Sequence, residues 1–79
     1  MNQIIEVLNK CDVAYFEGIS LDWFFDEEES TIAFFDSFDD HLFTVFNEIQ
    51  FTFNNSVLCF TLENGMNIQL DLYNLQCIN

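Results

Sequence analysis

The chain has 79 residues, of which fourteen are Asp or Glu and only one, Lys10, is Lys or Arg, so its formal net charge is −13 at pH 7. Such a polyanion is repelled by nucleic acid and by anionic membranes, which excludes proteins that bind either surface directly. Hydrophobic residues still make up 51% of the chain and include eleven Phe. The composition therefore predicts one folded domain over residues 1–79 and not a disordered acidic tail.

The first predicted element is a short helix near the start of the chain. Ile4, Ile5, Leu8 and Cys11 recur at the spacing that places apolar side chains on one helical face. Asn2 is available as the N-cap of this helix. We expect the apolar face of the helix to pack on a sheet.

The middle of the chain favours strands. One or two are expected between residues 13 and 23, around Gly18. Residues 31–35 are β-branched and aromatic, so a strand there can pair with residues 42–46 across the turn-like segment 36–41. Residues 42–48 fit two patterns, a helical face behind an Asp39 or Asp40 cap and a strand broken by Asn47. We favour the strand, and the helix remains open.

The clearest structural signal is a C-terminal hairpin. Alternating apolar residues in segments 58–62 and 66–72 flank Asn64-Gly65. This pair predicts a two-residue type I′ turn, because both central residues of that turn need positive φ. A strand over residues 49–53, followed by the turn-forming segment 54–56, is expected to join the same meander. The sequence therefore predicts an α+β fold, with an N-terminal helix packed on an antiparallel sheet of four or five strands that ends in a C-terminal β-meander.

Acidic residues concentrate in the first half of the chain. Ten of the fourteen lie between residues 12 and 40, namely Asp12, Glu17, Asp22, Asp26, Glu27, Glu28, Glu29, Asp36, Asp39 and Asp40. Duplex DNA carries about one charge per 1.7 Å of axis, so ten carboxylates match the charge on roughly 17 Å of duplex. One interpretation is a DNA-like surface and the other is an ordinary solvated face. The near-absence of Lys and Arg favours the first.

Three consecutive aromatic residues, Trp23, Phe24 and Phe25, directly precede the acidic run 26–29. In a strand they cannot all face the same side, so at least one can be exposed. An exposed aromatic side chain beside carboxylates is typical of a binding hot spot. We take Trp23 as the anchor, and the alternative is that all three belong to the core.

Other kinds of site find little support. The acidic segments lack calcium-loop spacing, and Cys11, Cys59 and Cys77 are too far apart for a zinc site, so no metal or cofactor is expected. His41 is the single His and no motif pairs a nucleophile with a base. A Cys–His pair could arise only through the fold, and we expect no enzyme. The odd cysteine count and the lack of a basic, apolar leader predict a protein of the host cell's cytoplasm.

In size, negative charge and aromatic content the chain resembles the small acidic DNA-mimic inhibitors of phages and mobile elements, which include anti-CRISPR proteins, anti-restriction proteins and uracil-DNA glycosylase inhibitors. The succession of Ile4-Ile5-Glu6, Glu17-Gly18-Ile19-Ser20-Leu21 and the acidic run 26–29 is similar to the helix and inserted strand of the glycosylase inhibitors. The resemblance implies an inhibitor that occupies the basic nucleic-acid-binding groove of a CRISPR effector, restriction enzyme or glycosylase.

The residues expected to bind this partner are the clustered acids and one aromatic: Glu17, Asp22, Trp23, Asp26, Glu27, Glu28, Glu29, Asp36, Asp39 and Asp40. Two alternatives stay open. The chain could be an immunity protein or antitoxin that neutralises a cationic toxin, or a structural or assembly module that forms a homodimer through its surplus aromatic residues.

Overall fold

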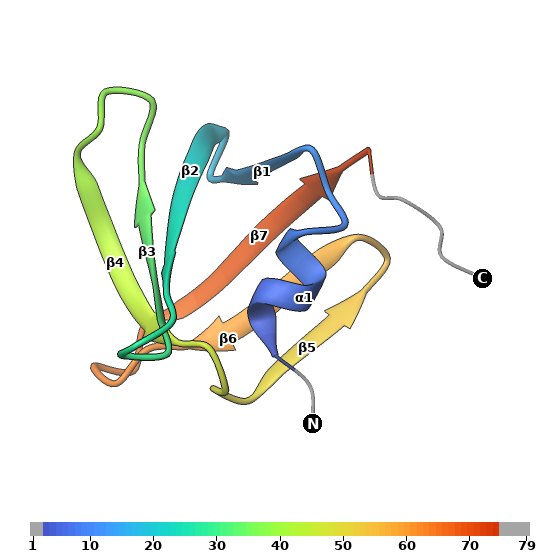
Figure 1. The fold of residues 1–79 in the computed structure, drawn as a ribbon. Coiled ribbons are helices and arrows are strands. Elements are labelled where there is room, and N and C mark those ends of the chain that lie inside the picture. Colours follow the sequence, from blue (N-terminus) through green and yellow to red (C-terminus); the bar gives the residue numbers. More distant parts are fainter. Residues whose placement is uncertain (1–2, 75–79) are drawn as a thin grey trace.

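A computed structural model describes residues 3–74 of the chain. One helix and seven strands follow one another along it (Figure 1): α1 (Ile4–Leu8), β1 (Val13–Phe16), β2 (Ile19–Asp26), β3 (Thr31–Phe35), β4 (His41–Phe46), β5 (Phe51–Asn54), β6 (Val57–Thr61) and β7 (Asn67–Tyr73). The strands form one sheet in the order β4-β3-β2-β1-β7-β6-β5, and every neighbouring pair is antiparallel.

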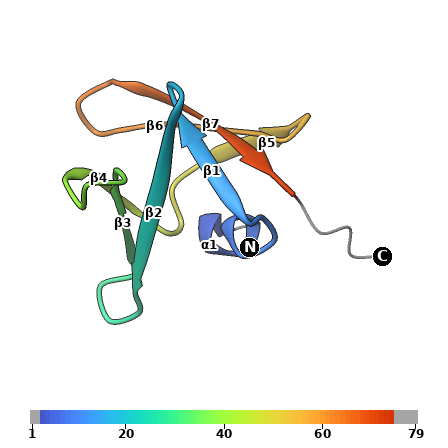
Figure 2. The same ribbon diagram turned by 90° about the horizontal axis from the view of Figure 1, so that it is seen from above.

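The predicted α+β fold is wrong. The helix has only five residues, and the sheet has seven strands where four or five were expected. Seen from above, the sheet curls into a half-barrel (Figure 2). The helix stops early because the chain must reach β1, whose start is tied to the last strand by a hydrogen bond from the Asp12 N–H to the Tyr73 carbonyl, 3.1 Å long. Cys11, expected on the helical face, therefore lies beyond the helix.

Two meanders make up the sheet and meet at one seam. Strands β1 to β4 follow one another through hairpins, as do β5 to β7, and the pairing of β1 with β7 joins the two series. β2 has eight residues, of which residues 19–21 pair with β1 and residues 22–26 pair with β3. We call β2, β3 and β4 the β2–β4 half, and β5, β6 and β7 the β5–β7 half.

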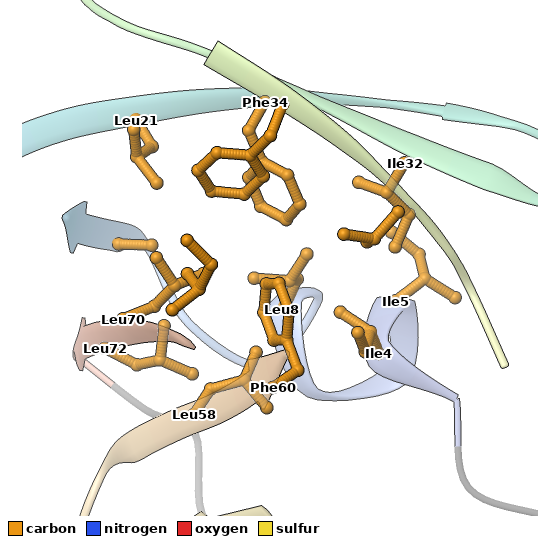
Figure 3. Packing of buried hydrophobic residues seen from close by; sticks show 14 residues of the cluster. Ile4, Ile5, Leu8, Leu21, Ile32, Phe34, Leu58, Phe60, Leu70 and Leu72 are labelled. Carbon is orange, nitrogen blue, oxygen red and sulfur yellow. The ribbon is translucent and has the colours of Figure 1, made fainter. Parts of the chain in front are cut away.

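Three buried aromatic rings connect the two halves. Phe34 on β3 and Phe43 on β4 have ring centroids 5.0 Å apart, and Phe60 on β6 lies 6.4 Å and 6.2 Å from them. All three side chains are at most 8% exposed. Figure 3 shows Phe34 and Phe60 facing one another, with Ile4 and Leu8 of α1 beside them. Aromatic pairs at such separations stabilise a core beyond the area they bury.

Asn47 holds α1 against the sheet. Its carbonyl oxygen accepts the Ile4 N–H and its Oδ1 accepts the Ile5 N–H, both at 3.0 Å. Its own N–H donates to the carbonyl of Ser30 at 2.8 Å. Asn47 is 1% exposed and is the one buried polar side chain of residues 3–74. The N-cap is Gln3, whose N–H donates to the Glu6 carboxylate, and the predicted cap Asn2 lies outside the described residues.

The C-terminal hairpin is confirmed, but its predicted two-residue turn is wrong. The Leu62 N–H donates to the Met66 carbonyl at 2.9 Å, which leaves a three-residue loop, residues 63–65, in which Gly65 has a φ of 88°. This is a turn that ends in a glycine bulge. A two-residue turn at residues 64–65 would place Phe60 opposite Gln69 and the apolar side chains of β6 and β7 on opposite faces. The observed register pairs Phe60 with Ile68.

The remaining strand predictions divide by segment. The strands over residues 31–35 and 42–46 are confirmed as β3 and β4, which pair with each other, so the helix considered for residues 42–48 is wrong. The strand predicted from residue 49 begins at Phe51. The hairpin of β5 and β6 has a two-residue turn, unlike the C-terminal hairpin. Asn55 and Ser56, with φ of 54° and 65°, connect the paired residues Asn54 and Val57.

Candidate functional site

Four of the predicted site residues lie at one end of the β2–β4 half, the upper end in Figure 1. Glu17 occupies the β1–β2 turn, and Asp36, Asp39 and Asp40 occupy the β3–β4 loop. Asp36 shapes that loop, because its Oδ1 accepts the N–H groups of Phe38 at 2.8 Å and Asp40 at 3.0 Å. Glu17, Asp39 and Asp40 are exposed, so their carboxylates face solvent.

Another four site residues lie at the opposite end (Figure 1): Asp26 ends β2, and Glu27, Glu28 and Glu29 follow in the β2–β3 loop. Asp26 Oδ1 accepts the N–H groups of Glu28 at 3.0 Å and Glu29 at 3.2 Å. Residues 27–29 are exposed. The end of the loop is fixed by the hydrogen bond from the Asn47 N–H to the Ser30 carbonyl. At about 3.3 Å per residue, the five residues of β3 separate the two acidic ends by roughly 16 Å.

Asp22 on β2 is exposed and pairs with Phe35, the last residue of β3, so it lies beside the β3–β4 loop at the first of these ends. Asp12 is also exposed but stands apart, immediately before β1. The fold therefore does not gather the clustered acids into one continuous patch. It divides them between the two ends of the β2–β4 half.

Strand alternation separates the three consecutive aromatic residues. Trp23 and Phe25 pair with Phe34 and Ile32 and pack against the core, each partly buried. Phe24 points the other way and is 62% exposed. The orientation of Trp23 thus favours a packing role over the predicted anchor role, and the exposed aromatic residue beside the acids is its neighbour.

The outer face of the β2–β4 half is a small grid of nine side chains. Cross-strand pairing places them in three rows, which are Asp22, Phe35 and His41, then Phe24, Ala33 and Thr44, then Asp26, Thr31 and Phe46. We call these nine residues the outer face. Phe46 is 57% exposed, and Phe35 is partly buried with its ring 5.6 Å from the His41 ring. Aromatic rings and carboxylates thus share one exposed surface.

Among the described residues Phe38 is the most exposed large hydrophobic side chain, at 84%. It lies in the β3–β4 loop among Asp36, Asp39 and Asp40. The predicted site includes neither Phe24 nor Phe38. The signals were present, since Phe24 is out of phase with Leu21 and its alternating partners, and Phe38 belongs to no alternating segment.

Cys11 and His41 are the groups to consider for a reactive Cys–His pair. Burial raises the pKa of the Cys11 thiol, and the charge of Asp12 raises it further, so the thiol stays protonated and weakly nucleophilic at neutral pH. Its Sγ donates to the Leu8 carbonyl at 3.2 Å, whereas His41 Nε2 is hydrogen bonded to Thr44 Oγ1 at 2.7 Å. Cys11 and His41 are therefore engaged elsewhere and do not form the Cys–His pair considered from the sequence.

Within residues 3–74, no group of three His, Cys, Asp or Glu side chains is arranged to hold a metal ion. Over the same range, no helix has the length and apolar character needed to cross a bilayer. The third cysteine, Cys77, lies outside the described residues.

An open groove of about 880 Å³ lies on the β5–β7 half. All of its lining residues are uncharged: Ile49, Gln50, Phe51, Thr52, Cys59, Phe60, Thr61, Asn67, Ile68 and Gln69. Such a groove offers hydrogen bonds to a partner but no electrostatic steering. It does not share residues with the outer face.

The chain has no significant match to a protein-family model, a curated protein or a solved structure.

Proposed function

We propose that this protein is an acidic inhibitor that mimics nucleic acid and occupies the basic groove of a host defence or DNA-processing enzyme, such as a CRISPR effector, a restriction enzyme or a uracil-DNA glycosylase. One observation carries the proposal. A chain of net charge −13 with a single basic residue places exposed carboxylates at both ends of one half of its sheet. Charge placed in this way is directed at a cationic surface.

The spacing of the acidic ends supports nucleic-acid mimicry. Their separation of roughly 16 Å equals the axial rise of about five base pairs of duplex at 3.4 Å each. A basic groove that binds two phosphate segments of one duplex would find two clusters of negative charge at a similar distance on this protein. The mimicry needs no base contacts, because phosphate contacts supply most of the non-specific affinity of such grooves.

The acidic loops are ordered by their own side chains. Asp26 and Asp36 each accept two backbone N–H groups within their loop. Glu17, Ser30 and Asp39 adopt positive φ, of 51°, 55° and 66°, which sharpens the three connections. Loops ordered before binding lose less conformational entropy when they bind, which favours affinity.

The test is an inhibition assay on a panel of purified enzymes: an RNA-guided nuclease, a restriction enzyme, a uracil-DNA glycosylase and a cationic nuclease toxin. We expect inhibition of one panel member that weakens steeply between about 50 and 500 mM salt and is relieved by added duplex DNA. Inhibition of the toxin alone identifies an immunity protein. Affinity that does not change over this salt range would contradict charge mimicry.

Matched double variants locate the charge that matters. Glu28→Gln/Glu29→Gln removes two carboxylates from the β2–β3 loop and is expected to weaken inhibition and flatten its salt dependence. Asp12→Asn/Asp71→Asn removes the same charge from exposed positions near the β1–β7 seam. Equal losses in the two variants would show that net charge alone acts, without a DNA-like arrangement.

The homodimeric module is a second candidate, and the free edges of the sheet favour it. Within residues 3–74, β4 pairs only with β3, and β5 pairs only with β6. An unpaired strand edge can add a strand from another chain, and neither edge carries the Lys or Pro that commonly prevents this. Sedimentation equilibrium at low and high salt decides, because a dimer of this chain must overcome like-charge repulsion and therefore strengthens as salt is added.

A further inference from the structure

We propose that the outer face of the β2–β4 half docks on an arginine-bearing, cationic protein surface, and that Phe24 receives one guanidinium group between Asp22 and Asp26. The inference rests on the proposed function in taking a basic protein as partner. It adds the face that makes contact and the side chain that is recognised.

The central strand of this site presents acid, aromatic ring and acid in sequence. Asp22, Phe24 and Asp26 alternate on the same side of β2, so neighbouring members are about 6.8 Å apart. Opposite Phe24 on β3 is Ala33, whose methyl group leaves the ring uncovered. Phe24 is accordingly 62% exposed although it lies within a paired strand.

The carboxylate of Asp26 is held in place. Its Oδ1 accepts N–H groups from Glu28 and Glu29, which leaves Oδ2 available to a partner. Asp22, at the other side of the ring, is exposed. Two carboxylates of this kind, one fixed and one free to turn, flank a single aromatic ring.

Arginine matches this arrangement better than any other side chain. Its planar guanidinium stacks on an aromatic ring and also donates hydrogen bonds within its own plane, so one group can contact Phe24 and the carboxylate on that side of the ring. The ammonium of lysine is a compact, strongly hydrated point charge that does not stack in this way. An apolar partner would remove Asp22 and Asp26 from water without compensation.

The rest of the face supplies apolar contact area. Phe46 is 57% exposed on β4, and the Phe35 ring is steadied by its edge contact with His41. A second copy of the chain does not fit as occupant, because it would bring its own net charge of −13 to a face already rimmed by carboxylates. Charge complementarity therefore selects a cationic partner.

The test uses two capped peptides as probes, one of alternating Arg and Gly and the other of alternating Lys and Gly at equal length. Each is titrated at low salt into protein labelled with ¹⁵N and with ¹³C-Phe, and binding is followed by NMR. We expect the Arg peptide to shift the Phe24 ring and the amides of Ala33 and Thr44, and to bind about two- to five-fold more tightly than the Lys peptide.

Two matched variants isolate the ring. Phe24→Leu keeps an apolar side chain at an exposed position but removes the aromatic face, so we expect the preference for Arg to disappear while the affinity for the Lys peptide is unchanged. Phe53→Leu, at a position 42% exposed on β5, should keep the preference. Asp22→Asn should lower the affinity for the Arg peptide more than Asp71→Asn does.

Three results would overturn the inference: equal affinity for the two peptides, shifts confined to residues 26–29 and 36–40, or shifts of the outer face caused by raising the concentration of the protein itself. The first two leave the proposed function standing, because charge mimicry does not need this face. A preference for Arg at Phe24 without inhibition of any panel enzyme would refute the proposed function and keep the docking face.

Discussion

The two halves of the sheet have similar backbones and different surfaces. Each is a three-stranded antiparallel meander that turns an apolar face to the common core. Residues 19–46 contain Asp22, Asp26, Glu27, Glu28, Glu29, Asp36, Asp39 and Asp40, whereas residues 51–73 contain only Glu63 and Asp71. The β5–β7 half thus forms the same kind of sheet almost without charge. A sheet of this kind therefore does not require many carboxylates, and their concentration on one half is the feature on which the proposed function rests.

The largest expected effect tests whether the halves form one cooperative unit. Phe60 belongs to the β5–β7 half, is 4% exposed and contacts the rings of Phe34 and Phe43 in the other half. Phe60→Ala should lower the free energy of unfolding by about 3–5 kcal/mol. Trp23, the single Trp, reports from the β2–β4 half, so urea unfolding followed by its fluorescence should show the full loss. An unchanged fluorescence midpoint would mean that the halves unfold independently.

The next effect separates the two sides of one strand. Trp23→Ala should destabilise the domain by about 2–3 kcal/mol, below the range for fully buried aromatics, because the side chain is only partly buried. Phe24→Ala should change the free energy of unfolding by less than about 0.5 kcal/mol, as exposed substitutions do, and should weaken partner binding. Urea denaturation and the inhibition assay measure both. If Trp23→Ala weakened partner binding and left stability unchanged, while Phe24→Ala lowered stability, Trp23 would be the anchor after all.

A smaller effect concerns the residue that ties α1 to the β2–β4 half. Asn47→Ala leaves the Ile5 N–H without its acceptor in a buried site and should cost about 1–3 kcal/mol of stability. The Ile5 amide should also exchange faster with solvent. Glu48→Gln, at the next position and exposed, is the control and should be neutral. Unchanged exchange at Ile5 in the Asn47 variant would show that another group takes over the hydrogen bond.

The smallest effect sharpens the contrast in charge. Self-repulsion among carboxylates opposes the folded state, so Glu28→Gln/Glu29→Gln should raise the melting temperature slightly at low salt and reduce its rise with added salt. Asp12→Asn/Asp71→Asn should do the same to a lesser extent, since the other acids are more distant. Thermal melts at two salt concentrations measure the difference. A lower melting temperature in the first variant would show that the β2–β3 loop depends on these two side chains.

Local pattern predicted the strands better than it predicted their connections. The β-branched and aromatic composition of residues 31–35 located β3, and the alternation in residues 42–46 and 58–72 located β4, β6 and most of β7. The same alternation also contained the correct loop length of the C-terminal hairpin, because apolar residues occupy even positions on both strands and require a loop with an odd number of residues. The prediction followed the Asn-Gly pair and ignored this constraint.

Other features depend on contacts that no short segment contains. The union of the two meanders in one sheet depends on the pairing of β1 with β7, which are far apart in sequence. The burial of Asn47 depends on meeting the backbone of α1. The division of the acids into two ends could not be read from their clustering between residues 12 and 40, because it depends on which hairpins turn at which end of the sheet.

The seam between β1 and β7 is the pairing that we expect to form last during folding. Each meander consists of local hairpins, which close within microseconds, whereas Ala14 must find Leu72 at the far side of the chain. During synthesis, at roughly 5–20 residues per second, β1 therefore waits several seconds with one edge unpaired. Nascent chains with open strand edges are prone to pair with one another. We expect the carboxylates of residues 12–40, which have already emerged by then, to oppose such pairing by like-charge repulsion until the seam closes.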